Sequence, residues 1–392
     1  MITRIVFILI LMVIVPDLYI DRRFISRLKG RKRLWRRILW WMPTTAMMVY
    51  TVFLVLDPRF APDDITIVNV YLFLIGLIIT PKCLFTICSA IGWCIRKLLR
   101  KKANYGNVVG MLLVLANWYI LFYGTFVGFQ KLTVRNVTFE SSELPASFDG
   151  YRIVQFSDAH LGTYIGGREH LLQEFVDTIN ALNPDMVAFA GDLQNREPKE
   201  IRPFVSVLGG IKAADGVYSV IGNHDYAHYI LADSATMAAN EQETRGLEKR
   251  MGWNVLVNEH STIKRGNDSI IVAGLDNDGD GKHFPQNGDI EKTLAGVKDS
   301  AFVVMLEHDP TCWRRKILPE TKAQLTLSGH THAMQFKLFG WSPASFVYEE
   351  WGGLFYEGTR AINVSTGMGG FIPFRFGVPG EVVVITLKKK GR

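Results

Sequence analysis

The sequence predicts an α/β protein with N-terminal transmembrane helices and a C-terminal soluble domain. Apolar runs that can cross a bilayer fall within the first 129 of 392 residues, and beyond residue 151 short apolar runs alternate with helical spacing. The charges divide at the same place, because residues 1–130 hold 17 Lys and Arg against 5 Asp and Glu, whereas residues 131–392 hold 27 against 32. We therefore expect a membrane region at 1–129, a polar linker at 130–150 with strand-like alternation at Leu132, Val134 and Val137, and a soluble domain at 151–392.

The membrane region contains four apolar runs, at residues 5–20, 38–56, 67–95 and 107–129. A span needs about 20 apolar residues, so the second and fourth runs qualify. The third run carries Pro81 and Lys82 near its middle, and we interpret it as one kinked or tilted helix. The first run also fits a signal peptide, but the basic stretch and further spans after it favour a retained helix, which gives about four transmembrane helices.

Basic residues indicate the orientation of these helices. They cluster in residues 22–37 and 96–102, whereas the loop between, at 57–66, is rich in Asp. Positive charge marks the cytoplasmic side, so the last span leads out of the cytoplasm. The prediction is a multi-pass cell-membrane protein with an extracytoplasmic soluble domain. Binding of anionic lipid by the basic runs is the alternative interpretation, and it leaves their sidedness unchanged.

Charge and cysteine content exclude several classes of function. The soluble domain has a net charge of −5, by 27 minus 32, which argues against a nucleic-acid partner. Three of four cysteines lie in an apolar stretch and Cys312 is alone in the soluble part, so neither a disulfide framework nor a CxxC zinc site is available. A metal would have to be held by His, Asp, Asn or Glu.

Polar residues that can bind metal follow five of the predicted strands of the soluble domain. In open α/β sheets, ligands bind beyond the carboxyl ends of strands. The strands are expected at 152–156, 186–190, 216–221, 270–273, 301–306, 323–327, 361–364 and 381–387, with a helix at 170–182. The residues after five of them are Asp158 and His160, Asp192, Asn223 and His224, His308, and His330 and His332.

Each of these motifs alone also fits a polar turn or a hydrogen-bonded histidine, but together they hold five of the nine histidines. We interpret the other four, His170, His228, His260 and His283, as ordinary polar residues. Nitrogen and oxygen ligands suit Mn, Fe or Zn. Two divalent ions need about seven protein ligands, including a bridging carboxylate. The motifs supply that number: Asp158, His160, Asp192, Asn223, His308, His330 and His332.

The motif order D-x-H, G-D, G-N-H-D, H and G-H-x-H resembles the calcineurin-like metallophosphoesterase family over residues 151–392. The stretches FDGYRIVQFSDAHLG and INVSTGMGG are similar to its bacterial membrane-associated branch. The resemblance implies two mixed β-sheets sandwiched between helices. It also implies that Asp158, His160 and His332 hold one metal, that Asn223, His308 and His330 hold the other, and that Asp192 bridges them. His224 would contact the phosphoryl oxygen or protonate the leaving group, with its ring oriented by Asp225.

The chemistry expected of such a site is hydrolysis of a phosphate ester or pyrophosphate. Two cations lower the pKa of a shared water, and the resulting hydroxide attacks phosphorus in line. Tethering to the bilayer suggests a lipid-linked substrate, although a phosphorylated small molecule also fits. A pyrophosphatase of a UDP-linked lipid A precursor is the alternative, but its substrate is cytoplasmic, which conflicts with the predicted sidedness. A non-enzymatic binding module would lack ligands, and none is missing here; a transporter would carry more ionisable residues in its spans.

Two further motifs give weaker signals. Arg196, in GDLQNR, is a candidate for contact with substrate phosphate, with a plain surface arginine as the alternative. Asp276, Asp278 and Asp280 begin like a calcium-binding EF-hand loop, but Pro285 interrupts it and Asn287 replaces the final glutamate. We interpret that segment as a loop near the rim of the active site.

Overall fold

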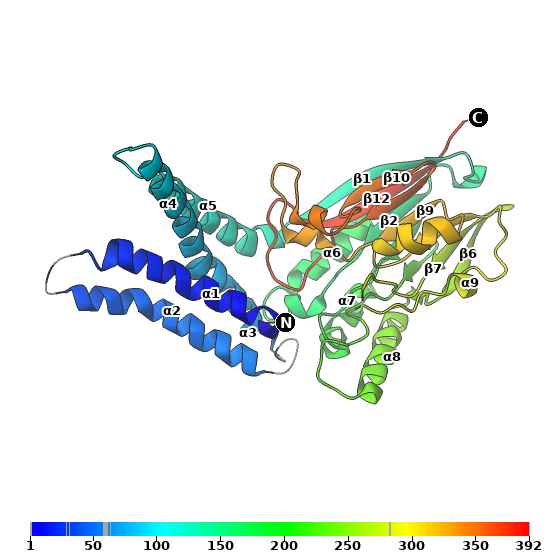
Figure 1. Cartoon of the computed structure of the whole chain (residues 1–392). Coiled ribbons are helices and arrows are strands. Elements are labelled where there is room, and N and C mark those ends of the chain that lie inside the picture. Colours follow the sequence, from blue (N-terminus) through cyan, green and yellow to red (C-terminus); the bar gives the residue numbers. More distant parts are fainter. Residues whose placement is uncertain are drawn as a thin grey trace. The chain divides into compact units, whose positions relative to one another are not determined.

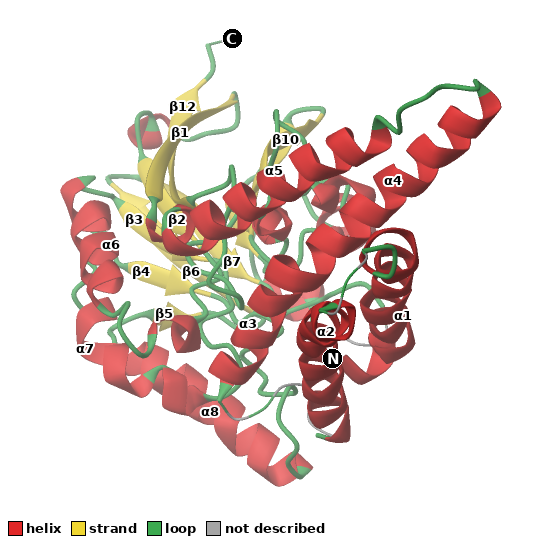
Figure 2. Cartoon of the chain, turned by 90° about the vertical axis from the view of Figure 1, so that its left-hand side faces the viewer, coloured by secondary structure: helices red, strands yellow, loops and turns green. Residues whose placement is uncertain are grey.

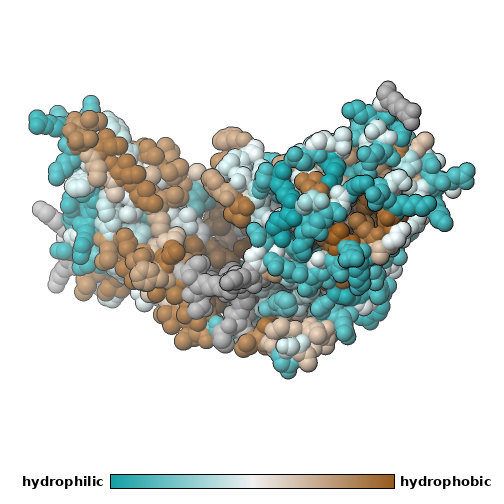
Figure 3. Space-filling view, turned by 45° about the vertical axis from the view of Figure 1, so that its right-hand side comes forward, coloured by the Kyte–Doolittle hydropathy of each residue, from teal (hydrophilic) through white to brown (hydrophobic). Residues whose placement is uncertain are grey.

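The computed structural model describes residues 2–28, 30, 32–57, 62, 64–281 and 284–391, with side chains from Val6 onward. The chain divides into two compact units, Met1–Phe126 and Val127–Arg392 (Figure 1). Lys29, Arg31 and His283, which contribute to the sequence interpretation, lie outside the described residues. Brown apolar side chains cover much of the N-terminal helices in Figure 3, whereas the second unit is mainly hydrophilic on the face shown.

The first unit consists of helices α1 to α5. Three described helical segments are long and apolar enough to cross a membrane: Arg33–Leu56, Ile65–Leu98 and Gly106–Gln130. The third predicted run is one continuous helix, in which a π-helical stretch at Ile75–Ile79 precedes Pro81, a residue that cannot donate a backbone hydrogen bond. Retention of the first run, which forms α1, stays a prediction. The helices are α1 (Ile2–Ile20), α2 (Arg33–Leu56), α3 (Ile65–Leu74), α4 (Thr80–Leu98) and α5 (Gly106–Phe126).

A buried ion pair joins three of these helices. Lys82 Nζ of α4 lies 2.9 Å from Asp17 Oδ2 of α1 and 3.0 Å from Thr44 Oγ1 of α2. Asp17 is fully buried, and Lys82 also lies over the ring of Trp40 at 4.8 Å. Asp17 and Lys82, each an ionisable residue within an apolar run, therefore pair with each other, as intramembrane charges usually do.

The second unit contains two six-stranded mixed sheets, in the orders β1-β12-β2-β3-β4-β5 and β10-β11-β9-β8-β7-β6. Strands β2 to β5 are parallel, as are β7, β8, β9 and β11. The strands are β1 (Leu132–Ser141), β2 (Arg152–Phe156), β3 (Met186–Phe189), β4 (Val217–Ser219), β5 (Asn254–Val255), β6 (Glu259–Arg265), β7 (Asp268–Gly274), β8 (Phe302–Leu306), β9 (Leu325–Ser328), β10 (Gly353–Glu357), β11 (Arg360–Val364) and β12 (Gly380–Lys389).

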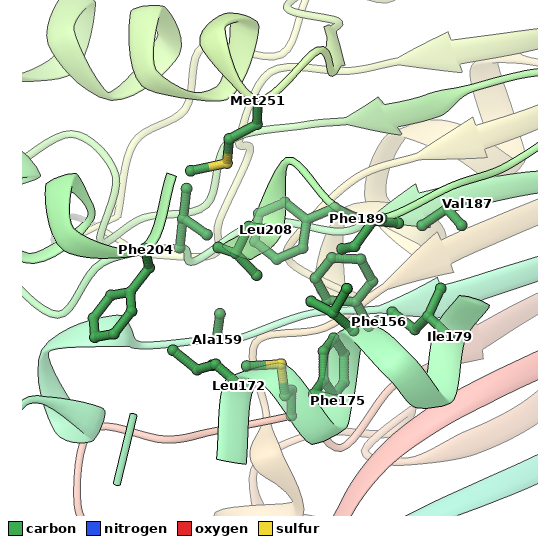
Figure 4. Close-up of a cluster of buried hydrophobic side chains, with 14 of the residues drawn as sticks. Phe156, Ala159, Leu172, Phe175, Ile179, Val187, Phe189, Phe204, Leu208 and Met251 are labelled. Atoms are coloured by element: carbon green, nitrogen blue, oxygen red, sulfur yellow. The ribbon is translucent and has the colours of Figure 1, made fainter. Parts of the chain in front are cut away.

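Alternation along the strands sends neighbouring side chains to different cores, because successive residues point to opposite faces of a sheet. Ile153 packs in the core shared by the two sheets, whereas Val154 packs in the core under the helices. In the helix-side core, Phe156 lies 5.2 Å from Phe175 and 4.8 Å from Phe189, between ring centroids (Figure 4). The covering helices are α6 (His170–Ala181), α7 (Val205–Leu208) and α8 (Ser234–Arg250), which line one side of the strands in Figure 2.

A third core covers the opposite face of the second sheet. It joins β7 and β8 to the helical segments at Trp313–Ile317 and Leu318–Glu320 (α10), with α9 (Ile290–Thr293) beside it. The unit is thus a sandwich of two mixed sheets between helices, and this predicted fold is confirmed.

The linker at 130–150 differs from the prediction. Residues Leu132–Ser141 form β1, which pairs in parallel with β12 from Leu132 opposite Gly380 to Ser141 opposite Lys389. The alternating apolar residues of this segment pack at the sheet edge, with Phe139 fully buried. Its partner strand lies about 250 residues away in sequence. The polarity of the segment therefore favoured a linker, although the segment pairs within the sheet. The segment belongs to the second unit.

Candidate dinuclear metal site

The candidate site lies where the carboxyl ends of strands from both sheets meet. Asp158 follows β2, Asp192 follows β3 and Asn223 follows β4, while His308 and His330 follow β8 and β9. The backbone turns sharply at these ends: φ is positive at Asp158, His160, Asp192, His330 and His332, between +47° and +73°. Asp and His adopt this left-handed region more readily than most residues.

Four of the predicted ligands form one group. One donor atom from each of Asp158, His160, Asp192 and His332 lies within 4.8 Å of all the others. The Nε2 atoms of His160 and His332 are 3.1 Å apart, and His332 Nε2 is 3.2 Å from Asp158 Oδ1. Asp158 is held by the backbone N–H of His330, which donates to its carboxylate at 3.0 Å.

The remaining predicted ligands form a second group beside the first. His330 Nδ1 lies 2.8 Å from Asn223 Oδ1 and 3.3 Å from His308 Nε2. His308 donates its Nδ1–H to the carbonyl of Ala190 at 2.7 Å, which turns Nε2 toward the site.

Asp192 connects the two groups through a single oxygen. Its Oδ2 lies 3.6 Å from His160 Nε2 in the first group and 3.3 Å from His308 Nε2 in the second. Its Oδ1 accepts the backbone N–H of His224 at 2.8 Å, which fixes the carboxylate. A Cβ on Gly222 would lie 2.2 Å from Oδ1, so only glycine fits beside it.

Asp225 does not orient the ring of His224, in contrast to the sequence prediction. Its carboxylate accepts backbone N–H groups of Asp192, Leu193 and Gly222 at 2.8–2.9 Å, so it fixes the two loops that carry Asp192 and Asn223. The ring of His224 is instead held through Nδ1, which donates to the carbonyl of Asn195 at 2.6 Å.

The electrostatics of the site favour a bound cation. Burial lowers the pKa of His160 to about 3, so its imidazole is neutral, the form that ligates metal. Burial and the charge of Asp192 raise the pKa of Asp158 to about 7, although His308 opposes this shift. The charge of Asp192 and its hydrogen bond outweigh burial and raise the pKa of His308 well above its usual range. The buried donor atoms of the first group lie within 4.8 Å of one another, where a bound cation would be favoured. This donor set fits two divalent ions of the kind that accept His, Asp and Asn ligands.

Comparison with known proteins gives a family for this constellation. Residues 151–334 match the model described as calcineurin-like phosphoesterase, and residues 3–129 match the one described as probable calcineurin-like phosphoesterase, transmembrane domain. The metallophosphoesterase YkuE of Bacillus subtilis is 32% identical over 260 residues, which cover 64% of this chain and 84% of that protein.

The chain belongs to the calcineurin-like phosphoesterase family. The prediction of a metal-dependent phosphoric ester hydrolase in a membrane protein is thereby confirmed at the level of the family, whose members use a dinuclear metal site.

Two other similar proteins carry related descriptions. A zebrafish protein named transmembrane protein with metallophosphoesterase domain is 32% identical over 275 residues, 68% of this chain. The alignment spans 60% of the length of that relative. A dimetal phosphatase structure, also from zebrafish, aligns over 61% of this chain and 99% of its own length, with 14% identity and a TM-score of 0.33.

Three residues near the second group of ligands were not predicted from the sequence motifs. Asp309 Oδ2 lies 3.6 Å from Nε2 of His330, and the hydroxyl of Tyr348 lies 3.2 Å from the same nitrogen. The amide of Asn223 donates from Nδ2 to the hydroxyl of Tyr229 at 2.7 Å, which leaves its Oδ1 toward His330. Asp309 directly follows His308 in sequence, and that adjacency was the one available signal.

The structure also describes the two weaker motifs, Arg196 and the EF-hand-like loop. Arg196 is buried, so the alternative of a plain surface arginine is wrong, and its contact with substrate stays a prediction. In the EF-hand-like loop, Asp278 is held in two ion pairs, because its carboxylate lies 2.9 Å from Arg315 Nη2 and 2.5 Å from Lys316 Nζ. The carboxylate of Asp278 is thus paired with side-chain cations.

Proposed function

We propose that this chain hydrolyses a phosphate ester or a pyrophosphate with two divalent metal ions. The observation that carries the proposal is the position of Asp192 Oδ2 between His160 Nε2 and His308 Nε2, as expected of a bridging carboxylate. Asp158, His160 and His332 would hold one ion, and Asn223, His308 and His330 the other. Mn, Fe and Zn all suit these ligands.

When bound, two divalent ions lower the pKa of a shared water and neutralise charge on the phosphoryl oxygens. His224 would act at the phosphoryl or leaving oxygen through Nε2, because its Nδ1 is engaged with the carbonyl of Asn195. Asp225 would keep Asp192 and Asn223 in register through the backbone of both loops. Arg196 remains a candidate for binding phosphate.

An assay with chromogenic esters tests this proposal. The full chain, purified in detergent with Mn²⁺, should hydrolyse bis(p-nitrophenyl) phosphate or p-nitrophenyl phosphate, and Asp192→Ala should abolish turnover. Asp299→Ala is the matched control, since Asp299 is exposed and pairs only at the surface with Lys322. Equal turnover by Asp192→Ala and the parent protein would refute the assignment.

The sidedness and the lipid-linked substrate are parts of the same proposal. We infer from the basic segments at 22–37 and 96–102 that the second unit is extracytoplasmic. A cysteine introduced near residue 60 should react with an impermeant reagent in intact cells, and one near residue 30 should not. The reverse pattern would overturn this orientation and restore the alternative substrate, a UDP-linked lipid A precursor.

A further inference from the structure

Exposed apolar side chains of the second unit are concentrated in one segment beside the candidate site. Between Met334 and Val347 the structure exposes six large apolar side chains: Met334, Leu338, Phe339, Trp341, Phe346 and Val347. Elsewhere in the described part of this unit, after Val127, those exposed are Ile165, Leu231 and Tyr356. A concentrated apolar patch on a soluble domain marks an interaction surface.

The exposure of this segment is built into its backbone. Leu338 and Trp341 exchange backbone hydrogen bonds of 2.8 and 3.0 Å, and the two residues between them, Phe339 and Gly340, have φ of +50° and +84°. Two positive φ values in a two-residue loop are typical of a type I′ hairpin turn. The turn places Phe339 at the tip, where its side chain is 100% exposed. We call residues 336–347 the apolar hairpin.

The apolar hairpin is fixed to the body of the domain. The N–H of Lys337 donates to the carbonyl of Phe376 at 2.8 Å, and the ring of Phe336 stacks on that of Phe376. Ser342 Oγ donates at 2.6 Å to the carbonyl of Ala333, the residue after His332. The apolar hairpin is therefore a rigid projection whose apolar tip extends from the body of the domain (Figure 1, orange segment before β10).

Both ends of the apolar hairpin connect to the candidate site. It begins four residues after His332, and it is followed by Tyr348, whose hydroxyl contacts His330 at 3.2 Å. Any surface that receives Phe339 and Phe346 is therefore held next to the ligands of both proposed metal ions.

We propose that the apolar hairpin docks into the interfacial layer of the bilayer that anchors this chain. Phe and Trp side chains favour that layer, where apolar rings reach the acyl chains. Lys337 is the one charged residue between 334 and 348, and the acidic residues that follow, Glu349 and Glu350, pair with Arg314. Five residues, 127–131, join α5 to β1, which limits the start of the domain to within ~20 Å of the end of the last span.

Docking of the apolar hairpin at the bilayer surface would determine which class of substrate reaches the site. If the proposed function holds, the site opens at the bilayer surface and takes a phosphate or pyrophosphate carried on a lipid, with the acyl chains still in the membrane. The inference deepens the proposed function and rests on it for the substrate. The docking itself can be tested without catalysis.

Photo-crosslinking tests the docking. The full chain is reconstituted in phosphatidylcholine vesicles with p-benzoylphenylalanine in place of Phe339, or in place of Leu231 as a matched exposed control. Position 339 should form lipid adducts, detected by mass, at least about tenfold more often than position 231. Adducts to this chain or to a second copy, or equal lipid labelling at both positions, would overturn the proposal.

Hydrolysis tests the substrate class. Phe339→Ser with Phe346→Ser should lower turnover of phosphatidic acid or a lipid pyrophosphate in vesicles by about tenfold or more, given the area each ring buries. Turnover of p-nitrophenyl phosphate should stay within about twofold, and Leu231→Ser should change neither rate. An equal loss on both substrates, or a parent protein that cleaves the chromogenic esters but no lipid phosphate, would refute the lipid assignment. A parent protein inactive on every substrate would refute the proposed function, and the cross-links would still report docking.

Discussion

Replacing Arg375 with lysine should destabilise the second unit by ~3–4 kcal/mol. This guanidinium is buried and donates only to backbone carbonyls, with six hydrogen bonds of 2.5–3.2 Å. The acceptors are Thr366, Gly367, Gly369, Val378 and Pro379. Lysine has three donors, so at least three of the six bonds are lost, at about 1 kcal/mol or slightly more each.

The loss should also reach the site, because the same loop holds Asp158. The N–H of Gly369 donates to the carbonyl of Asp158 at 3.0 Å, and a Cβ on Gly367 would lie 2.8 Å from the Asp158 side chain. We therefore expect weaker binding of Mn²⁺ by Arg375→Lys, measured as the Mn²⁺ concentration that gives half-maximal turnover.

Thermal unfolding of the detergent-solubilised full chain measures the effect on stability. For a unit of this size, 3–4 kcal/mol lowers the midpoint by about 6–16 °C. Arg202→Lys is the matched control, since Arg202 is exposed and pairs at the surface with Glu243, and it should change the midpoint by under about 2 °C. A shift of less than about 3 °C for Arg375→Lys would show that the carbonyls find other partners, and the reasoning would be wrong.

Three further predictions follow from the same structure. Asp309→Asn should weaken metal binding or activity by about 10–100-fold, because Asp309 faces His330 Nε2. The control Asp299→Asn should have no such effect, and equal Mn²⁺ titrations of the two variants would contradict this prediction. Burial raises the pKa of Glu200 to about 7, so its contribution to stability is complete below 4.5 and is lost as pH rises through 7. The unfolding free energy of Glu200→Gln relative to the parent should therefore rise by ~2–3 kcal/mol between pH 5 and pH 8, and a constant difference would refute it. In the first unit, Asp17→Asn or Lys82→Met alone should destabilise by ~3–5 kcal/mol and the double variant by less, as a double-mutant cycle would measure.

The positions of the candidate ligands could be predicted from the sequence because they follow from the order and direction of the strands. Parallel strands deliver their carboxyl ends to one edge of a sheet, so the polar residues after β2, β3 and β4 share one edge and those after β8 and β9 share another. The packing of the two sheets brings these edges together. The order of the apolar runs and the residues that end them are visible in the sequence. The pairing partner of each strand is not, and it was not required to predict which residues lie at the carboxyl ends.

The roles that sequence reasoning missed depend on backbone contacts between distant segments. Asp225 looked like a partner for the adjacent His224, yet its carboxylate accepts N–H groups near Asp192, more than 30 residues away. The ring of His224 is held by the backbone carbonyl of Asn195. Because every residue has a backbone carbonyl, no residue type in the sequence indicates this contact. The alternation at Leu132, Val134 and Val137 indicated a strand, but its place in the sheet was not predicted, because its partner β12 lies at the other end of the unit.

The positive φ values at the site explain why the sandwich around it has to be rigid. Each left-handed non-glycine residue costs roughly 1–3 kcal/mol, and Asp158, His160, Asp192, His330 and His332 all adopt this conformation. Their sum is comparable to the ~5–15 kcal/mol by which a domain is stable. The cost is therefore offset by contacts outside the ligands, such as the carboxylate of Asp225 on two loops and the N–H of Gly369 on Asp158. Those same contacts hold the donor atoms at close range before any ion arrives. Rigidity beneath the ligands and preorganisation for two metal ions are thus one property of this fold.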